Sequence, residues 1–431
     1  MAILVAVVVL LSLPVSSRGD RRLPLDDVIL SVFGAFSGTF ATLDPERDLS
    51  LFGQALILGT IQVGGFGFMV GTTLVLMILR GLNPGTSLRA GLMIRDGSPA
   101  LSLSDALDVS GRILRFILVS EALGALAFAA WLADRMPLGD ALWQGLFYAV
   151  GSFCNAGFDL TGTGQSIEPY RGSVVFQAIM FALIQLGTLS WLVFADLRDR
   201  RSWRRLRVET RLILAVHVGL LAVGTLGMMV GEWNGVLRGD SVAAKGLLSL
   251  FHSASARSAG YQSIRFSEAS DATQFLYSAL MLIGGAPGST AGGFRLTTLA
   301  VIAVAVLSTM AGQQDAQTMG RRISPTVVGQ ALVIAVLVMG VWFATTLAVG
   351  LAERANPIDP AFTNIAFDAA SAVGSVGFTT GDPVGYGPAG KLILSAAMLV
   401  GKTGPLTVAY ALQRRVRVRR YRVPETPIHL G

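Results

Sequence analysis

The stretch Ser152-Phe153-Cys154-Asn155-Ala156-Gly157-Phe158 decides how the rest of the chain is interpreted. It is short and uncharged, it lies between two long apolar runs, and an amphipathic segment that begins at Asp140 leads into it. Similar layouts end in Ser255-Ala256-Arg257-Ser258-Ala259-Gly260-Tyr261, in Gly374-Ser375-Val376-Gly377-Phe378 and in Phe40-Ala41-Thr42-Leu43. These stretches recur roughly every 110 residues, which indicates a fourfold internal repeat of a whole structural unit.

Composition places the chain in a membrane. Of its 431 residues 52% are hydrophobic and 14% are charged, whereas a soluble domain carries about 25% charged residues. About eight apolar runs come near the ~20 residues that a spanning helix needs. The one cysteine, Cys154, excludes an internal disulfide and a cysteine-based metal site. The three histidines, His217, His252 and His429, lack the spacing of metal ligands.

Basic residues gather in four segments, which are residues 81–110, 198–211, 311–325 and 413–431. The connections between them are mostly acidic. If each unit crosses the membrane twice, the basic segments all fall on one side, as the positive-inside rule requires. The excess of positive charge therefore indicates a cytoplasmic face rather than a partner nucleic acid, and both termini are expected to be cytoplasmic.

Each unit has the pattern of a spanning helix, a half-helix, an extended segment and a second spanning helix. The half-helices begin near Asp26, Asp140, Asp240 and Asp359, at or near a cap position. They are too short to cross ~30 Å of hydrocarbon, and non-helical backbone at that depth must be buried or line a water-filled cavity. The predicted fold is an all-α membrane protein with four tandem helix–pore-loop–helix repeats, which comprise about eight transmembrane helices and four re-entrant half-helices around one pseudo-fourfold pore.

The expected repeats are residues 1–80, 111–197, 212–310 and 326–412, joined by cytoplasmic links 81–110, 198–211 and 311–325 and followed by a basic tail, 413–431. Residues 1–15 also fit a signal peptide. No basic residue precedes this run, and the repeat requires a helix there, so we expect a first spanning helix.

Three glycines point to the chemistry of the extended segments. Gly157, Gly260 and Gly377 stand in register, and an aromatic residue follows each of them. Glycine tolerates positive φ, which can turn carbonyls toward an axis, and half-helix C-termini favour cations. A ring of such carbonyls can replace the hydration shell of a cation. The alternative, packing glycines in ordinary helix links, does not account for the shared register.

These segments resemble the second, third and fourth filter segments of the Trk/Ktr/HKT superfamily of potassium transporters. Residues 284–295, Gly-Gly-Ala-Pro-Gly-Ser-Thr-Ala-Gly-Gly-Phe-Arg, resemble the interrupted helix of its third repeat, and residues 401–407, Gly-Lys-Thr-Gly-Pro-Leu-Thr, resemble its last helix. The resemblance covers nearly the whole chain and is closest to the bacterial KtrB/TrkH ion-conducting subunit. It implies one pore per subunit, a homodimer in the bacterial plasma (inner) membrane, and a cytosolic nucleotide-binding regulatory ring of the TrkA/KtrA type.

The resemblance implies no cofactor and makes K⁺ the permeant ion, with Na⁺ as the other candidate. The expected selectivity filter consists of Phe40, Ala41, Thr42, Leu43, Cys154, Asn155, Ala156, Gly157, Phe158, Ser258, Ala259, Gly260, Tyr261, Gly374, Ser375, Val376, Gly377 and Phe378. K⁺ is expected at the carbonyls of Asn155, Ala156, Ser258, Ala259, Ser375 and Val376. The expected outer mouth holds Asp44, Asp159 and Asp382.

The first filter segment departs from the family. Members usually carry a Thr-Gly pair there, whereas Thr42 is followed by Leu43. Leu43 takes the place of the glycine, or, with a one-residue gap, the glycine is missing. Leucine at positive φ costs on the order of 1–2 kcal/mol, so we expect another backbone path and an asymmetric filter. In the family, loss of this glycine accompanies a weaker potassium preference.

Residues 284–293 are glycine-rich inside an apolar run. A phosphate loop is excluded, because no lysine follows the last glycine and no strand precedes it. A helix kink remains possible, but a mobile loop beneath the filter explains both length and composition. Lys402 is expected in mid-membrane, with Glu121 or Asp368 as its counter-charge. The expected gate consists of Gly284, Gly285, Gly288, Ser289, Thr290, Gly292, Gly293 and Lys402.

The sequence therefore predicts uptake of a monovalent cation, most simply K⁺, through a carbonyl-lined filter gated by an intramembrane loop. Channel and symport mechanisms both stay open. A weakly selective or Na⁺-permeable protein, or a non-conducting subunit, is the alternative that Leu43 raises. A carrier with inverted repeats is disfavoured because the four units run in the same direction. An enzyme is disfavoured because no catalytic constellation stands at workable spacing.

Overall fold

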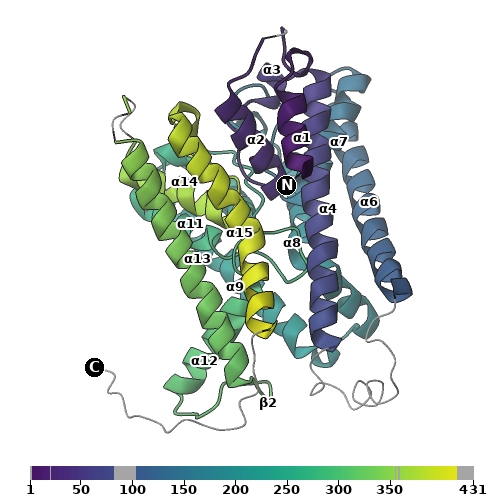
Figure 1. Ribbon diagram of the computed structural model, residues 1–431, viewed down its shortest axis with the longest axis vertical. Coiled ribbons are helices and arrows are strands. Elements are labelled where there is room, and N and C mark those ends of the chain that lie inside the picture. The colour runs from purple at the N-terminus through teal and green to yellow at the C-terminus, as the bar shows by residue number, and fades with distance from the viewer. Residues whose placement is uncertain (1, 20, 82–102, 355, 358–359, 415–431) are drawn as a thin grey trace.

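The computed structural model describes residues 2–19, 21–81, 103–354, 356–357 and 360–414. Within these ranges the regular structure is almost entirely helical, and the long helices run along a common direction (Figure 1). The all-α prediction is confirmed, with one addition. Residues of the expected link 311–325 form an antiparallel hairpin of β1 (Gln317–Thr318) and β2 (Arg321–Arg322). Most of the expected link 81–110 and of the basic tail lies outside the described residues.

The helices follow the expected order of four units. The first unit comprises α1 (Ala2–Leu11), α2 (Leu25–Ser37), the short α3 (Pro45–Asp48) and α4 (Leu51–Gly81). The second comprises α6 (Leu103–Leu132), α7 (Leu138–Cys154) and α8 (Val174–Arg200). The third comprises α9 (Val208–Gly231), α10 (Val242–Ser255), α11 (Asp271–Met281) and α12 (Leu296–Met310). The fourth comprises α13 (Pro325–Ala352), α14 (Phe362–Gly374) and α15 (Pro388–Arg414).

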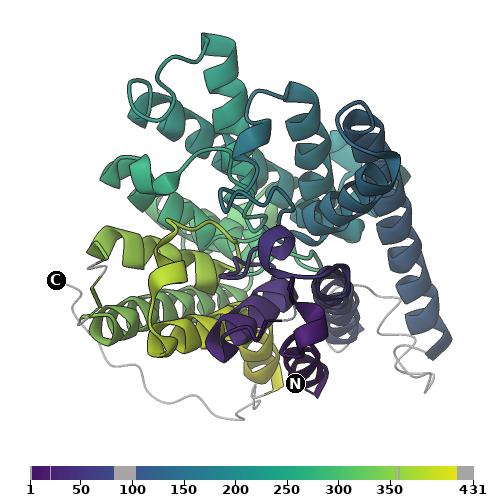
Figure 2. The same cartoon turned by 90° about the horizontal axis from the view of Figure 1, so that it is seen from above.

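The four units surround a common centre, as the view from above shows (Figure 2). In each unit a helix that follows the half-helix packs on the half-helix of the next unit: α4 packs on α7, α8 on α10, and α11 on α14. The packing of α15 on α2 closes the ring. At this last contact Lys391 Nζ lies 3.1 Å from Asp26 Oδ2 and 2.6 Å from Asp27 Oδ1. The repeated contact is what brings the four half-helices to one place.

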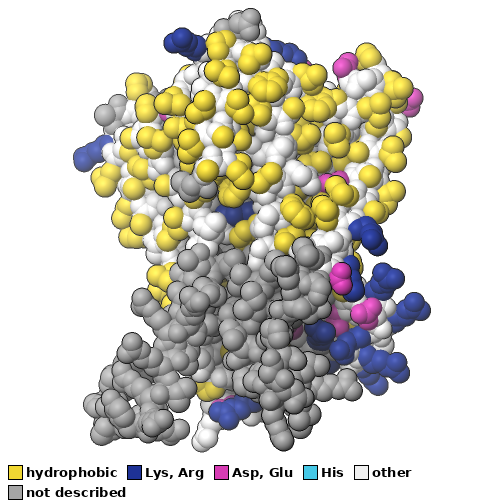
Figure 3. All heavy atoms as spheres, turned by 45° about the vertical axis from the view of Figure 1, so that its right-hand side comes forward, with side chains coloured by type: hydrophobic (Ala, Val, Ile, Leu, Met, Phe, Trp, Pro, Cys, Tyr) yellow, Lys and Arg dark blue, Asp and Glu magenta, His cyan; other side chains and the backbone are white. Residues whose placement is uncertain are grey.

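Five helices of the described chain are long and apolar enough to cross a membrane, namely those at 51–71, 108–132, 174–200, 208–231 and 325–352. The helix α1, with 10 residues, and α12, with 15, are shorter. Hydrophobic side chains cover the upper part of the surface in Figure 3, and Lys and Arg side chains gather at its lower end. An apolar belt above a basic end is the surface of a membrane protein.

The half-helices α2, α7 and α10 begin close to the predicted aspartates. Asp240 directly precedes Ser241, whose Oγ accepts a hydrogen bond from the Ala244 N–H of α10 at 3.2 Å. The helices α2 and α7 begin after prolines, and their aspartates lie in the first helical turn. These aspartates thus lie near the cap position without being the cap residue, and a carboxylate in the first turn complements the positive helix end. Asp359 lies outside the described residues.

Candidate functional site

The four half-helices end in one type of backbone turn. A residue in the left-handed region follows α2, α7 and α14, with φ between 52° and 74°: Gly38, Asn155 and Ser375. After α10 the corresponding residue is Ser258, with φ 88°. The next residue then donates its N–H to the last helical turn, as Thr39 does to the Gly34 carbonyl and Ala156 to the Gly151 carbonyl, both at 2.8 Å. This shared turn defines the register of the four segments.

Two residues beyond the left-handed position lies a level at which the backbones of the segments approach closely, called here the closest level. This level holds Gly157, Gly260, Gly377 and Phe40. A Cβ added to Gly157 would lie 2.9 Å from the carbonyl carbon of Gly260, and one added to Gly377 would lie 3.0 Å from Gly260 Cα. The latter would also lie 3.3 Å from the carbonyl carbon of Thr39, which precedes Phe40. Three of the four segments therefore need glycine here because their backbones approach within van der Waals contact.

The predicted alignment of Leu43 with the three glycines is wrong. Counted from Gly38, which supplies the left-handed turn, Phe40 takes that position, and the carbonyl carbon of Thr39 just before it is the atom of unit one that lies near Gly377. Neither Phe40 nor Leu43 has positive φ, so the expected strain at Leu43 does not arise. The Phe40 side chain is 3% exposed and belongs to a hydrophobic cluster with Phe378 and other residues of units three and four. The Leu43 N–H instead donates to Ser31 Oγ at 3.2 Å.

The three glycines also differ among themselves. Gly260 has φ 76° and Gly377 has φ 108°, whereas Gly157 is absent from the positive-φ residues. The prediction that positive φ explains all three glycines is thus wrong for Gly157, where the close approach of Gly260 is the reason for glycine. The four segments are therefore asymmetric, as expected, but the difference separates units one and two from units three and four. Units three and four use positive φ at this level, and units one and two do not.

A cavity of about 120 Å³ opens at the far end of the four segments, beside α3. Asp44 and Asp159, two of the three expected mouth residues, line it. The Asp159 carboxylate accepts hydrogen bonds from the Thr161 N–H at 3.0 Å and the Thr161 hydroxyl at 2.6 Å. Burial raises the pKa of Asp159, and the nearby charge of Asp44 adds to this, against the Thr161 bonds. The side chain of Asp382 lies outside the described part of the chain.

The glycine-rich loop 284–293 lies at the opposite end of the segments, where the half-helices stop. Its predicted gate residues between Gly284 and Gly293 are all buried. The Asn155 side-chain amide donates to Thr290 Oγ1 at 2.9 Å. The Gly292 N–H donates to Ser258 Oγ at 3.0 Å, and this hydroxyl donates to the Ser375 carbonyl at 2.7 Å. The loop thus contacts Asn155 and Ser258, the left-handed residues of units two and three. The Ser258 hydroxyl links it to Ser375, the left-handed residue of unit four.

The loop is also bonded to a break in α8. Ser190 has φ 71° and ψ 146°, which interrupts the helix. The carbonyls just before the break accept hydrogen bonds from the loop: Thr188 from the Ala286 N–H at 2.9 Å, and Gly187 from the Thr290 N–H at 3.3 Å. Buried carbonyls released by a broken helix need such partners. The loop and the kink therefore stabilise each other.

Two cationic side chains, those of Lys402 and Arg295, donate hydrogen bonds to the loop 284–293. Lys402 Nζ donates to the Thr290 carbonyl, and Arg295 Nη1 donates to the Ala291 carbonyl at 2.6 Å and to Ser289 Oγ at 3.2 Å. Both lie over the Phe68 ring, at 5.2 and 5.0 Å from its centroid. Cations over an aromatic face are favourably placed when desolvated. Lys402 therefore contacts the predicted loop directly.

The carboxylates considered as partners of Lys402 are engaged elsewhere. Glu121 accepts hydrogen bonds from Gln62 Nε2 at 3.1 Å and from Cys154 Sγ at 3.6 Å. Asp368 accepts from the Thr380 N–H at 3.0 Å and its hydroxyl at 2.7 Å. In place of the suggested counter-charges, the Thr290 carbonyl of the loop accepts from the Lys402 ammonium group.

Sequence reasoning missed three contributors to this site: Gly38, Thr39 and the kink residue Ser190. A glycine at the end of an amphipathic half-helix is the usual sign of a left-handed helix end, so Gly38 carried a usable signal for the register. Ser190 carried none, because serine has no preference for the conformation it adopts there. Arg257, within the third filter segment, places Nη1 2.8 Å from His217 Nδ1 on α9.

Comparisons with known proteins agree with this arrangement. Residues 22–418 match the TrkH family model, which is described as a cation transport protein. The chain is 29% identical to the potassium/sodium uptake protein NtpJ of Enterococcus hirae, over 98% of this chain and 93% of the relative. It is 28% identical to the Ktr system potassium uptake protein B of Bacillus subtilis, over 94% and 89%.

Among solved structures, the potassium transporter TrkH of Vibrio parahaemolyticus has a similar fold, with a TM-score of 0.67 over 91% of this chain and 79% of that one, at 16% identity. The family match covers most of the sequence and all four filter segments. It is a family of transporters, so the chain is not an enzyme. The chain belongs to the TrkH family of cation transport proteins.

Proposed function

We propose that this protein takes up K⁺ through a filter formed by the four extended segments. The observation that carries the proposal is the close approach of four non-helical backbones, between a cavity with two aspartates on one side and a buried loop on the other. Such backbone is tolerated in a membrane where it lines an ion path. Half-helix C-termini at the same place add negative potential for a cation.

In this proposal the ion is coordinated at two levels of backbone carbonyls. The outer level comprises Ala156, Ala259 and Val376, and the inner level comprises Asn155, Ser258 and Ser375, as the sequence suggested. The register adds Thr39 and Gly38 as the contributors of unit one. The Ser375 carbonyl already accepts from Ser258 Oγ. A carbonyl oxygen has a second lone pair, so this bond orients the group and leaves it able to contact an ion.

The loop 284–293 and Lys402 form the gate in this proposal. The support is their position at the inner ends of three segments and the direct contact of Lys402 with Thr290. A cation in the path repels permeating cations while it is held there. Opening requires the loop to leave Asn155 and Ser258, and withdrawal of the loop also removes the carbonyl that anchors Lys402.

A Na⁺-permeable pore is the second candidate, because one observation favours it. Phe40 replaces glycine at the closest level, so unit one cannot follow the backbone path that Gly260 and Gly377 take. Fewer equivalent carbonyls give a weaker preference for K⁺ over Na⁺. The Enterococcus hirae relative carries both potassium and sodium in its name. If the absence of this glycine prevents ion coordination altogether, the protein is a subunit that conducts neither ion.

We also propose a homodimer in the inner membrane, with both termini and the arginine-rich link 198–211 in the cytosol. A cytosolic nucleotide-binding ring would bind the same face and move the loop. The positive charge of that face supports this orientation. The Bacillus subtilis relative is named as protein B of a Ktr system.

The test is ion flux in liposomes of the purified protein, with K⁺ and Na⁺ compared on one preparation. A clear K⁺ preference supports the first candidate, and equal or Na⁺-leaning flux supports the second. Absence of flux for both ions, when it persists after a cytosolic regulatory ring is added, contradicts conduction. Deletion of residues 286–291 should raise basal flux, and an unchanged flux would overturn the gate.

A further inference from the structure

The seam between units two and three contains a groove that the ion path does not use. It has a volume of about 350 Å³ and is lined by α8 and α10, with Ala178 and Phe181 on one wall and Leu247 and Phe251 on the other. This is room for roughly a dozen water-sized groups. The lining residues Val174 and Leu247 are 59% and 45% exposed, so the groove opens at the outer surface of the helix bundle, where the bilayer lies. An apolar groove in that position suits an acyl chain.

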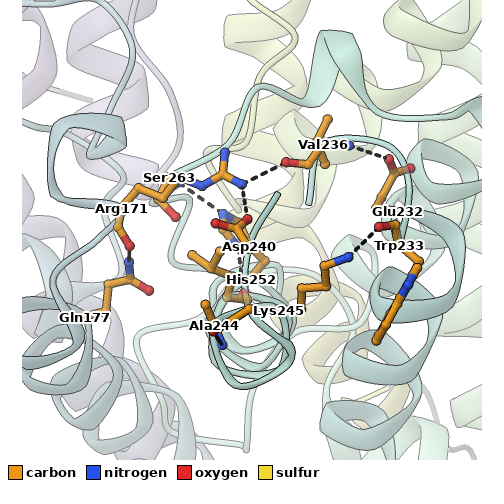
Figure 4. A network of polar contacts seen from close by, with 12 residues as sticks. Arg171, Gln177, Glu232, Trp233, Val236, Asp240, Ala244, Lys245, His252 and Ser263 are labelled. Carbon is orange, nitrogen blue, oxygen red and sulfur yellow. Dashed lines mark hydrogen bonds and ion pairs between the residues drawn. The ribbon is translucent and has the colours of Figure 1, made fainter. Parts of the chain in front are cut away.

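A pair of opposite charges closes one end of the groove. Arg171 Nη2 donates to Asp240 Oδ2 at 2.6 Å and to the Val236 carbonyl at 2.8 Å, as Figure 4 shows. Among the described residues, the hydrogen bonds of this guanidinium use Nη2 alone. The two side chains are 29% and 26% exposed. Both groups therefore keep polar atoms that can face a ligand in the groove.

The neighbouring residues Lys245 and Trp233 indicate that Arg171 and Asp240 lie at the depth of the lipid headgroups. Lys245 on α10 donates to the Trp233 carbonyl at 2.6 Å and lies 4.2 Å from the centroid of the Trp233 ring (Figure 4). The Trp233 side chain is 40% exposed, and tryptophan gathers at the boundary between water and hydrocarbon. The charged end of the groove thus lies at the boundary, and its apolar walls lie below it.

We propose that this groove binds a phospholipid with a zwitterionic ethanolamine headgroup. The lipid phosphate bonds the free nitrogens of Arg171, a pairing that guanidinium groups favour. The ammonium group donates to Asp240, and one acyl chain lies between α8 and α10. Choline has no N–H to donate, and a glycerol headgroup has no positive charge for Asp240. The two charges of the site therefore select ethanolamine over both.

The site is adjacent to the filter in the chain. Phe251 lines the groove, and the next residue, His252, accepts a hydrogen bond from the Ser263 N–H at 3.0 Å. The helix α10 ends at Ser255, shortly before Ser258 and Gly260 of the third filter segment. A lipid in the groove therefore packs against α10, the helix that positions the third of the four filter segments.

The test measures lipid binding without transport. The full-length protein is placed in nanodiscs of equal parts phosphatidylethanolamine, phosphatidylcholine and phosphatidylglycerol, and the lipids retained after extraction are identified by native mass spectrometry. We expect phosphatidylethanolamine to be retained about tenfold over the other two, since one additional charge-assisted hydrogen bond distinguishes it. Ala178→Trp fills the groove and should abolish the retention, while Ala366→Trp, which fills a groove between α11, α13 and α14, should leave it unchanged.

Asp240→Asn should remove the preference between headgroups, because Asp240 is the group that accepts from the ethanolamine ammonium. If that variant does not fold, Ala178→Trp still decides, because it leaves the ion pair intact. Equal retention of the three lipids, a preference for phosphatidylglycerol, or unchanged retention in Ala178→Trp overturns the proposal. A change of the protein from dimer to monomer in Ala178→Trp, without a change in lipid, shows that a second copy of the chain covers the groove and also overturns it.

Discussion

Phe40→Gly is the substitution that most directly tests the register of the filter. It places glycine at the closest level of all four segments, beside Gly157, Gly260 and Gly377. The backbone of unit one is then free to take positive φ, as in units three and four. One more inward carbonyl dipole, counted at about 1.4 kcal/mol of discrimination, corresponds to a tenfold increase in the K⁺/Na⁺ permeability ratio. Reversal potentials in liposomes with opposed K⁺ and Na⁺ gradients measure this ratio.

The same change has a cost in stability that the assay must separate from selectivity. Phe40 is 3% exposed within a large hydrophobic cluster, and truncation of a buried phenylalanine costs about 3–5 kcal/mol. Glycine adds roughly 0.5–1 kcal/mol of backbone entropy. Thermal unfolding of the purified variant should therefore occur at a lower temperature. A permeability ratio does not depend on the amount of folded protein, so it is the quantity to compare.

Leu43→Gly is the matched control. Leu43 is 6% exposed, lines the same outer cavity and loses a side chain of comparable burial. Because it does not stand at the level of the glycines, we expect lower stability with an unchanged permeability ratio. The opposite result, with a ratio that rises in Leu43→Gly and stays constant in Phe40→Gly, would refute the register derived from the left-handed turn at Gly38.

Three further predictions concern the loop, the helix packing and the outer cavity. Thr290→Val keeps the shape of the side chain but removes a hydroxyl that bonds Asn155 and Phe153 of unit two. Each lost hydrogen bond destabilises the closed loop by about 1 kcal/mol, so basal flux should rise several-fold. Unchanged flux would contradict the gate. Gly65→Ala places a Cβ 2.5 Å from Cys154 Sγ and should reduce the yield of folded protein, whereas Gly67→Ala meets nothing within 4 Å and should be neutral in the same expression assay. The raised pKa of Asp159 means that its charge is lost at a higher pH than for an ordinary aspartate, so flux should fall as the external pH is lowered, and Asp159→Asn should be slow and insensitive to pH.

The repeated architecture was predictable because each unit carries two independent signals. One is an amphipathic segment too short to cross the bilayer, and the other is an uncharged stretch with a glycine and an aromatic residue. The half-helices predicted to begin near Asp140 and Asp240 are observed as α7, Leu138–Cys154, and α10, Val242–Ser255. The loop 284–293 was predictable for a similar reason, since its glycines cannot continue a helix cheaply.

The details of unit one were not predictable from the same signals. Alignment on glycine fails where glycine is absent, and the neighbouring Thr42 then directs the alignment to Leu43. The turn that fixes the register is a property of backbone angles, which glycine at position 38 permits but does not require. The partner of Lys402 was hidden for another reason. Every residue has a backbone carbonyl, so the sequence does not show which carbonyl accepts from Lys402. A search for counter-charges therefore finds carboxylates even when the ammonium group donates to a carbonyl.

The break in α8 gives the proposed gate two definite states. In a continuous helix the Thr188 carbonyl would accept from the Leu192 N–H, four residues on. In this structure the Leu192 N–H bonds Ser190 Oγ at 3.3 Å, and the Thr188 carbonyl accepts from Ala286 of the loop. The Ala286 N–H of the loop therefore takes the place that the Leu192 N–H would have at the Thr188 carbonyl of a continuous helix.

Release of the loop leaves that buried carbonyl without a partner unless α8 straightens, since an unmade buried bond costs about 1–3 kcal/mol. Straightening would move the C-terminal half of α8, where Asp196 bonds Arg200 at 2.8 Å, next to the basic link 198–211. A regulator that binds this link more tightly in one state would thereby shift the loop. Amide hydrogen exchange at Leu192 should slow when the gate opens, and faster exchange on opening would show that the loop moves without the helix.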